Sequence, residues 1–293
     1  MEILVPAYRY PTLGTMWATL AAGVPAGGSG VRVDVILNPA SGPGTQVDPV
    51  YVAAVQGARA AGARILGYVD TGYGSVASDS VLAQVQAYMT MYGIDGVFLD
   101  DLDNSPPPSG TLAYAQQITA GIHAMLPGSL VVANPGAAVP ESFVAQNAAD
   151  VLVTYENDLL SATEPYGATP PPAWVSSYPA GRFANIVYNV AGVAAMQTAV
   201  SLARTRNVGV IYVTDAAGAD SYDVMPSYWA QEFAPARGCP ADFDCSGTVT
   251  VQDIFDFLSA WFARDPRADF DGSGSITVQD IFDFLGAWFS KCG

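Results

Sequence analysis

The sequence predicts an α/β fold: an eight-stranded (β/α)8 TIM-type barrel over residues 1–236, followed by a small all-α domain over residues 239–293. Two observations lead to this prediction. In the first part, short apolar runs alternate with longer amphipathic stretches, as in a parallel sheet that helices cover on the outside. In the second part, a segment of 23 residues occurs twice with 18 identical positions and a period of 27 residues.

Composition restricts the class of protein further. The chain has 27 acidic and 11 basic residues, a net charge of −16, which argues against binding to nucleic acid or anionic membrane through bulk charge. Apolar residues make up 51% of the chain and are sufficient for a large core. No uncharged apolar run approaches the length of about 18 residues that a transmembrane helix requires.

The barrel strands are expected where apolar residues cluster in short runs. Runs this apolar, separated by helices, are typical of a parallel sheet that is buried on both faces. The predicted strands are Ile3–Tyr8, Arg32–Leu37, Arg64–Val69, Gly96–Asp100, Leu130–Ala133, Val151–Tyr155, Asn185–Tyr188 and Gly209–Val213.

Helices are expected between these strands, except in the Pro-rich stretch 161–182, which is expected to be irregular. A doubly wound sheet is the alternative, but it would usually carry a Gly-rich phosphate turn after the first strand, where this chain has Tyr8-Arg9-Tyr10-Pro11. The predicted helices are Leu13–Ala22, Pro49–Ala61, Ser78–Tyr92, Thr111–Met125, Glu141–Asn147, Val193–Thr205 and Tyr222–Phe233.

Polar and aromatic residues gather at the carboxyl ends of the predicted strands. In a barrel of this kind these ends form one rim, which is where reactive groups lie. We therefore expect one substrate-binding surface at this rim, made of Tyr8, Tyr10, Asn38, Tyr68, Asp70, Tyr73, Asn134, Tyr188 and Asp215.

Three acids on this rim are the candidate catalytic residues. Asp100 and Asp101 end the fourth strand, and Glu156 ends the sixth. Cleavage of a glycoside needs two carboxyl groups on either side of a sugar, while aromatic rings and amides hold the sugar itself. The only histidine, His123, is expected on a helix surface, so triads and zinc sites that depend on histidine are excluded.

Strand-end acids also cap the helices that follow, which is the structural alternative for each acid taken alone. Asp103 and Asp158 are expected to be such loop caps.

Each copy of the C-terminal repeat begins with a calcium-loop pattern. Oxygen-bearing side chains occupy loop positions 1, 3, 5, 7, 9 and 12, and glycine occupies position 6, where the loop turns sharply. Two bound Ca²⁺ ions are predicted. The candidate ligands are Asp242, Asp244, Ser246, Thr248, Thr250 and Asp253 in the first loop, and Asp269, Asp271, Ser273, Ser275, Thr277 and Asp280 in the second.

An amphipathic helix follows each loop, with Ile254, Leu258 and Trp261 at i, i+4 and i+7 in the first copy. Four further aromatic residues are expected in the small core of this domain, with a surface for a partner as the alternative: Phe255, Phe262, Phe282 and Phe289. All three cysteines lie in this region, and the sequence leaves open whether Cys239 pairs with Cys292 or with Cys245.

The repeated units resemble dockerin modules. Each unit has aspartate at position 12 and lacks a helix before the loop. The resemblance covers residues 239–293 and implies two calcium ions and an anchoring role, with a cohesin-like or cell-surface protein as the partner, in a secreted enzyme.

The barrel resembles the spherulin-4 family, glycoside hydrolase family 135. The resemblance is carried by LVPAYRYP at the start, ILNPASGPG at 36–44, LGYVDTGYG at 66–74 and GIDGVFLDD at 93–101. It implies a (β/α)8 barrel that hydrolyses α-1,4-linked N-acetylgalactosamine within galactosaminogalactan-type exopolysaccharide. The family's acids map onto Asp100, Asp101 and Glu156, with Asp-Asp here where the family commonly has Asp-Glu.

The wider resemblance to related galactosaminidase families implies a retaining mechanism, with Asp100 as nucleophile and Glu156 as acid/base. Together the sequence predicts a secreted endo-acting glycoside hydrolase with a calcium-dependent anchoring module, although no signal peptide is visible in this chain. Two alternatives stay open: a catalytically inert sugar-binding or coat protein, and a barrel hydrolase of another aminosugar polymer.

Overall fold

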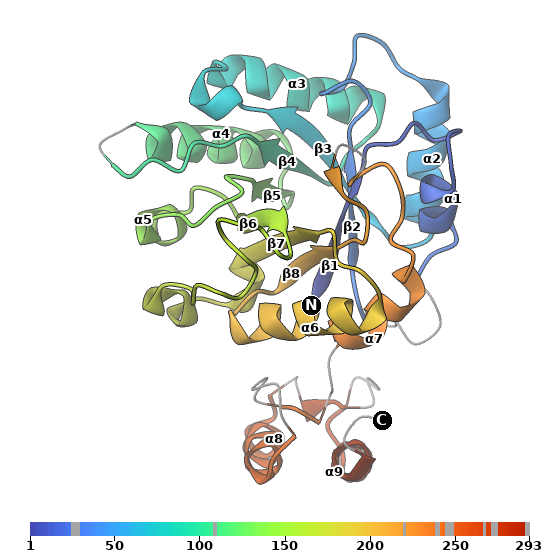
Figure 1. The fold of residues 1–293 in the computed structure, drawn as a ribbon, viewed down its shortest axis with the longest axis vertical. Helices are drawn as coiled ribbons and strands as arrows, with labels where there is room; N and C mark the ends of the chain where they lie inside the picture. Colours follow the sequence, from blue (N-terminus) through green and yellow to red (C-terminus); the bar gives the residue numbers. More distant parts are fainter. Residues whose placement is uncertain are drawn as a thin grey trace.

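The computed structural model describes residues 1–24, 30–107, 110–218, 221–237, 241–243, 249–265, 268–270 and 275–290. Eight parallel strands form a closed barrel in sequence order, with β1 hydrogen-bonded to β8 (Figure 1). The prediction of a TIM-type barrel is confirmed. The strands are β1 (Glu2–Ala7), β2 (Val33–Leu37), β3 (Arg64–Asp70), β4 (Gly96–Asp100), β5 (Leu130–Ala133), β6 (Val151–Asp158), β7 (Phe183–Tyr188) and β8 (Val210–Val213).

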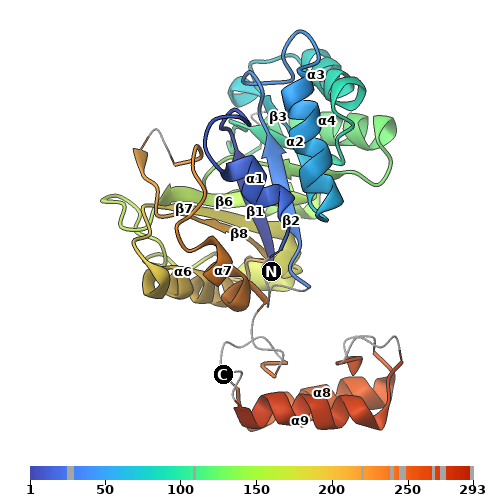
Figure 2. The ribbon, with the colours of Figure 1, turned by 90° about the vertical axis from the view of Figure 1, so that its right-hand side faces the viewer.

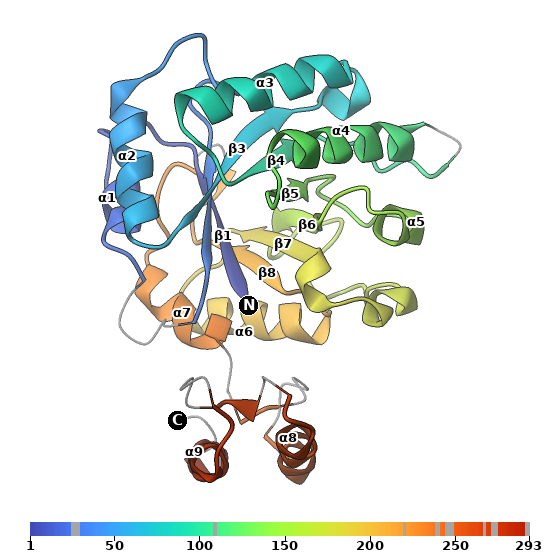
Figure 3. The ribbon, with the colours of Figure 1, turned by 180° about the vertical axis from the view of Figure 1, so that it is seen from behind.

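Helices surround the barrel, and their apolar faces pack on the outside of the strands (Figures 1 and 3). Between β6 and β7 the described chain has only two short 3-10 turns, η2 (Ala173–Ser177) and η3 (Ala180–Arg182), as expected for the Pro-rich stretch. The helices of the barrel are α1 (Met16–Ala21), α2 (Pro49–Ala60), α3 (Ser78–Met91), α4 (Thr111–Met125), α5 (Glu141–Ala145), α6 (Val193–Thr205) and α7 (Trp229–Arg237).

Two helices begin later than the sequence predicts. The first was expected from Leu13, but Gly14 has φ +83°, which an α-helix cannot accommodate, and α1 begins at Met16. The last was expected from Tyr222, but Pro226 keeps the preceding residues out of the helical region, and α7 begins at Trp229. The second difference matters for function, because it leaves Tyr222 in the loop that follows β8.

The C-terminal region has a hydrophobic core of its own, formed by α8 (Val251–Ala263) and α9 (Val278–Ser290), which lie side by side in Figure 2. The rings of Phe257 and Phe284 stack at its centre with centroids 4.1 Å apart. The two repeats hold each other: the Trp261 indole N–H donates to the Thr277 carbonyl at 2.8 Å, and the Trp288 indole N–H to the Thr250 carbonyl at 2.7 Å.

The prediction that four phenylalanines fill this core is wrong. Phe255, Phe262, Phe282 and Phe289 are all exposed, and the last of these has 76% of its surface accessible. Each helix has apolar residues on two sides, and only the side with Phe257 or Phe284 faces the other repeat. The exposed phenylalanines therefore form a second, solvent-facing apolar surface. None of the helices that the structure describes combines the length and apolar composition needed to cross a lipid bilayer.

A cluster of charged side chains lies at the end of the barrel where the strands begin. Arg64 donates two hydrogen bonds to the fully buried Asp34 carboxylate, at 2.8 and 2.7 Å, and one to Glu2 at 2.8 Å. These three residues come from β3, β2 and β1. Because the fork of the guanidinium satisfies both oxygens of Asp34, the buried charge is compensated at this end of the barrel.

We expect Arg64→Leu to lower the free energy of unfolding by about 3 kcal/mol, because it leaves the Asp34 charge buried without its partner. Arg32→Leu is the matched control: Arg32 lies 3.3 Å from the same Glu2 but is mostly exposed, so its loss should cost less than about 1 kcal/mol. Chemical denaturation of the full chain measures both. Equal losses in the two variants would contradict the role given to the buried pair.

Candidate functional site

Asp100 lies at the carboxyl end of β4 and is held by two neighbouring strands. The Tyr68 hydroxyl on β3 donates to its Oδ2 at 2.8 Å, and the Asn134 side-chain amide, just beyond β5, donates to its Oδ1 at 2.8 Å. Tyr68 and Asn134 are both buried. Both oxygens of the carboxylate therefore accept hydrogen bonds from groups that have little freedom to move.

Glu156 faces the same interior from β6. The Tyr222 hydroxyl donates to its Oε1 at 2.5 Å, and the Asn134 amide nitrogen donates to its Oε2, also at 2.5 Å. The backbone N–H of Glu156 donates to the Gly136 carbonyl at 3.0 Å, so that the loop after β5 is attached to the strand that carries the acid. Glu156 is thus fixed at its backbone and at both oxygens.

One amide nitrogen bridges the two acids. Asn134 Nδ2 lies 2.8 Å from Asp100 Oδ1 and 2.5 Å from Glu156 Oε2, so these oxygens are no further apart than the sum of the two distances, 5.3 Å. The Gly136 N–H donates to Asn134 Oδ1 at 2.8 Å, which directs the nitrogen toward the acids. The structure therefore brings together Asp100, Glu156 and Asn134, as expected from the strand ends.

Burial and the neighbouring Glu156 affect the protonation of Asp100. Burial raises the pKa of Asp100 to about 6, and the neighbouring Glu156 charge also raises it. The hydrogen bonds from Tyr68 and Asn134 oppose this rise because they stabilise the ionised form. Near neutral pH the site therefore holds an ionised Asp100 whose charge is poorly solvated.

Aromatic rings form the wall beside the acids. The Tyr8 ring packs edge-on against Tyr68 and Tyr222, with centroids 5.6 and 5.5 Å away. Burial, followed by the charges of Asp100 and Glu156, raises the pKa of the Tyr8 hydroxyl well above its usual range. Tyr68 and Tyr222 are thus the hydroxyl donors to the acid pair, and the Tyr8 ring packs against both of them.

Asp101 makes contacts that are separate from those of the Asp100 carboxylate, and its backbone carbonyl accepts two of them. Thr71, which is fully buried, donates its hydroxyl to the Asp101 carbonyl at 2.7 Å, and the Tyr73 N–H donates to that carbonyl at 2.7 Å. Asp101 and Tyr73 have φ of +49° and +53°, a conformation uncommon for residues other than glycine. The Tyr73 ring is 66% exposed at the rim, and a hydrogen bond to Asp101 raises the pKa of its hydroxyl.

Four of the predicted substrate-binding residues use their side chains in the structure of the rim loops. Each bonds to a nearby loop or helix start, and no side-chain hydrogen bond in the described part of the chain joins them to the acid pair, although Asp70 is the neighbour of Asp100 on β3. The pairs are Tyr10 with the Asp48 carboxylate, Asn38 with the Gly42 N–H, Asp70 with the Gly72 N–H and Asp215 with the Ser227 N–H. Tyr188 bonds to Asn157, and burial, followed by the nearby Glu156 charge, raises the pKa of the Tyr188 hydroxyl.

Asp103 and Asp158 are loop caps, as predicted. Asp103 accepts from Ser105 and from the Thr111 hydroxyl at the start of α4, and Asp158 accepts from the Leu160 N–H. His123 lies on α4 and contacts Asp150 at 2.9 Å, away from the strand ends.

Two residues of the site were missed by sequence reasoning. Tyr222 was assigned to a helix, although its position nine residues after β8 places it in a rim loop; the proline at 226 was the available signal. Thr71 follows Asp70 at the end of β3, and its N–H and hydroxyl both bond to the Asp100 carbonyl, at 3.0 Å each. A buried threonine at a strand end gives no signal that separates it from core packing.

The predicted calcium loops are described only in part. Asp244, Ser246, Thr248, Asp271 and Ser273 lie outside the described residues, as do Cys239, Cys245 and Cys292. At position 12 of each loop, Asp253 and Asp280 are completely buried.

The carboxylates at position 12 close the loops. Asp280 accepts from the N–H of Phe270 at 2.7 Å and of Thr277 at 2.6 Å, and Asp253 accepts from the Thr250 N–H at 2.7 Å. These bonds join position 12 to positions 2 and 9 of the same loop.

Comparison with known proteins identifies the barrel. The model of the spherulation-specific family 4, spherulin-4, matches residues 2–235. The chain belongs to this family. Spherulin-4 of Physarum polycephalum is 29% identical over 243 residues, covering 79% of this chain and 69% of that protein. The family resemblance inferred from the sequence is therefore confirmed for the barrel.

Solved structures share the fold of this family member. Sph3 of Aspergillus clavatus, determined in complex with GalNAc, aligns with a TM-score of 0.67 at 23% identity, over 80% of this chain and 96% of that one. The α-L-fucosidase isoenzyme 2 of Paenibacillus thiaminolyticus aligns with a TM-score of 0.52 at 12% identity, over 85% and 51%. The barrel thus has the same fold as these two proteins.

Since burial raises the pKa of Asp100 from 3.8 to about 6, its folded form binds a proton more tightly than its unfolded form. Asp100→Asn should therefore become more stable relative to the unsubstituted chain by about 2–3 kcal/mol as pH rises from 4 to 7, and the difference should stay constant at higher pH. Urea unfolding at a series of pH values measures this.

Asp103→Asn provides a control of opposite sign. Hydrogen bonds from Ser105 and Thr111 lower the pKa of Asp103, so its contribution to stability should be present at neutral pH and be lost as pH falls. A pH-independent difference between the unsubstituted chain and Asp100→Asn would contradict the burial assigned to Asp100.

Proposed function

We propose that the barrel is a glycoside hydrolase that cleaves α-1,4-linked N-acetylgalactosamine within an exopolysaccharide of the galactosaminogalactan type. The observation that carries the proposal is the pair of carboxylates, Asp100 and Glu156, held by one amide at the carboxyl ends of the strands. Family membership and the GalNAc bound to the structurally similar Aspergillus clavatus protein support the choice of sugar.

The spacing of the acids favours a retaining mechanism. Retaining enzymes hold their two carboxyl groups about 5–5.5 Å apart, whereas inverting enzymes need about 6.5–9.5 Å to admit a water molecule. The bridging amide limits the nearest oxygens of Asp100 and Glu156 to 5.3 Å. We therefore assign a covalent glycosyl-enzyme intermediate to this site.

In the first step, ionised Asp100 attacks the anomeric carbon, and the bond from that carbon to the leaving oxygen breaks. Glu156 donates its proton to this oxygen. In the second step, Glu156 removes a proton from water, the water oxygen bonds to the anomeric carbon, and Asp100 is released. Tyr222 and Asn134 hold Glu156 in place, and Tyr68 and Asn134 hold Asp100.

Other residues of the rim would bind the sugar chain. The exposed ring of Tyr73 offers a face for stacking, and its hydrogen bond to Asp101 sets the ring's position. Asp101 thus orients a binding surface in this proposal. Tyr8 and Tyr188 lie nearer the acid pair and would contact the sugar that is cleaved.

We expect Glu156→Gln to lower kcat on the polymer about 10²- to 10⁴-fold, because proton donation to the leaving oxygen is lost. The first turnover of a dinitrophenyl glycoside should be spared, since its leaving group needs no proton. Asp100→Asn should remove turnover of both substrates. Glu141→Gln, the same change at an acid on α5 that bonds to Tyr178, is the control and should retain full activity.

Polymer binding by these variants decides between the proposal and its alternatives. If Asp100→Asn and Glu156→Gln bind the polymer and the unsubstituted chain does not cleave it, the barrel is a sugar-binding protein. Cleavage of another aminosugar polymer in preference, seen in the products from defined polymers, would replace the substrate but keep the mechanism.

For residues 239–293 we propose a dockerin-like module that binds two Ca²⁺ ions and anchors a secreted enzyme to a cohesin-like or cell-surface protein. The buried Asp253 and Asp280 at position 12, and Asp242 and Asp269 at position 1, would hold the ions together with the other loop oxygens. The solvent-facing phenylalanines offer an apolar surface for a protein partner.

Asp253→Asn and Asp280→Asn should each reduce the calcium bound by the full chain from about two ions to about one, because each removes a charged ligand from one loop. Asp256→Asn on α8 is the matched control, since Asp256 bonds only to the exposed Gln252 side chain in the described contacts. Isothermal titration with Ca²⁺ after chelator treatment counts the ions. Unchanged stoichiometry in both loop variants would refute the calcium assignment.

A further inference from the structure

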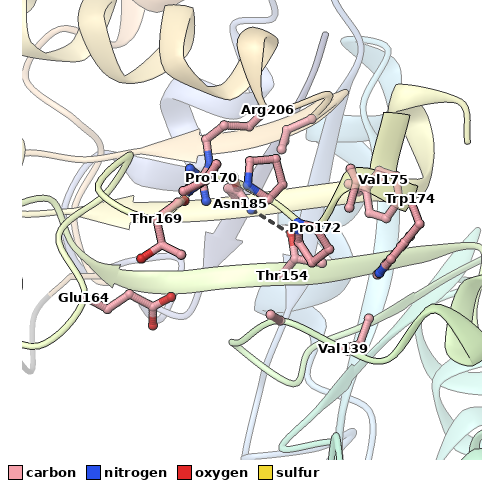
Figure 4. A pocket seen from close by; sticks show the side chains of 14 residues that line it. Val139, Thr154, Glu164, Thr169, Pro170, Pro172, Trp174, Val175, Asn185 and Arg206 are labelled. Carbon is pink, nitrogen blue, oxygen red and sulfur yellow. Dashed lines mark hydrogen bonds between the residues drawn. The ribbon is translucent and has the colours of Figure 1, made fainter. Parts of the chain in front are cut away.

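The outer face of the barrel behind Glu156 lacks a covering helix. Between β6 and β7 the chain passes through the Pro-rich stretch, and a cavity of about 160 Å³ lies between this stretch and the two strands. Thr154, Phe183 and Asn185 of the strands line it, together with Trp174 and Arg206 (Figure 4). The cavity does not include Asp100 or Glu156 and is separate from the acid pair.

Beside this cavity β6 contains one residue more than the segment of β7 with which it pairs. Val153 pairs with Ala184 on β7, but Tyr155, and not Thr154, pairs with the next residue, Asn185. Such a bulge puts two successive residues on one side of the strand and reverses the alternation beyond it.

The bulge decides where Glu156 points. Val153 faces the barrel interior, and strict alternation from there would turn Tyr155 inward and Glu156 outward. With the extra residue, Tyr155 lies on the outer face, where its ring packs on Tyr166 at 4.7 Å, and Glu156 pairs with Ile186 and faces the interior.

Asn185 holds the bulged residue. The side-chain N–H of Asn185 donates to the Thr154 hydroxyl at 3.1 Å, the bond drawn in Figure 4. The side-chain oxygen of Asn185 accepts from the Tyr166 hydroxyl at 2.9 Å. Asn185 is 2% exposed, so its side chain is held in a fixed position between β6 and Tyr166. Arg206 lies over the Tyr166 ring, 5.5 Å from its centroid, and covers this set of contacts.

We propose that Asn185 and Thr154 are positioning residues for the acid/base Glu156: their hydrogen bond keeps the extra residue on the outer face and so keeps Glu156 aimed at Asp100. The cavity beside Thr154 makes this bond important, because no packed helix restrains the bulge from that side. The inference rests on the proposed function, since it assigns a role in the reaction of Glu156.

Thr154→Val tests the inference, because it keeps the shape of the side chain and removes the acceptor of the Asn185 bond. We expect kcat on the polymer to fall about 10- to 100-fold, as a displaced catalytic group requires, with KM unchanged. The first turnover of the dinitrophenyl glycoside should be spared, as in Glu156→Gln. Thr154→Ser restores the hydroxyl and should restore kcat.

Thr169→Val makes the same chemical change in another residue that lines the cavity, in the stretch that faces β6, and should leave both substrates unaffected. If Thr154→Val does not fold, Tyr166→Phe takes its place: it removes only the bond to the Asn185 oxygen and should cause a smaller loss of the same kind.

The outcomes separate this inference from the function on which it rests. Full polymer activity in Thr154→Val, with activity lost in Glu156→Gln, overturns the positioning role alone. Equal losses on both substrates in Thr154→Val also overturn it, because a general loss of structure does not spare the activated glycoside. Full activity in Thr154→Val and in Glu156→Gln removes the acid/base role proposed for Glu156 and the positioning role together, whereas absence of cleavage by the unsubstituted chain removes the glycosidase assignment.

Discussion

The direction of one side chain on β6 determines whether this barrel has a paired acid site. Side chains on a strand alternate between two faces, so a single extra residue decides whether every later residue faces the interior or the helices. The bulge at Thr154 turns Glu156 inward, toward Asp100 and Asn134. The contacts of Tyr222 and Gly136 with Glu156 all follow from this choice.

Once both acids face inward, the site must hold two neighbouring carboxyl groups away from water. The structure does this with neutral donors: a shared amide from Asn134 and hydroxyl groups from Tyr68 and Tyr222. No lysine, arginine or histidine in the described part of the chain bonds to either acid, and burial, together with the Glu156 charge, raises the pKa of Asp100. A cationic partner at Asp100 would oppose this rise in pKa.

The sequence was sufficient for whatever depends on periodicity and on strand ends. Apolar runs located all eight strands, and the rule that parallel strands end on one rim brought Asp100, Asn134 and Glu156 together. The sequence was insufficient where several local conformations or packing arrangements are close in energy. A bulge changes the count by one residue without changing composition, and Tyr222 was placed by a loop whose path depends on tertiary contacts. Phe255 was misplaced because α8 has two apolar sides, and periodicity alone does not tell which one packs.

In the C-terminal region the repeated sequence unit is one copy, but the reciprocal tryptophan contacts make the folded unit two copies. Trp261 of the first repeat bonds to a carbonyl of the second, and Trp288 of the second bonds to a carbonyl of the first. Each repeat of 27 residues therefore depends on the other for the acceptor of its tryptophan hydrogen bond and for one of the two stacked phenylalanine rings. A single copy has nothing to fold against, so the duplication can be gained or lost only as a whole.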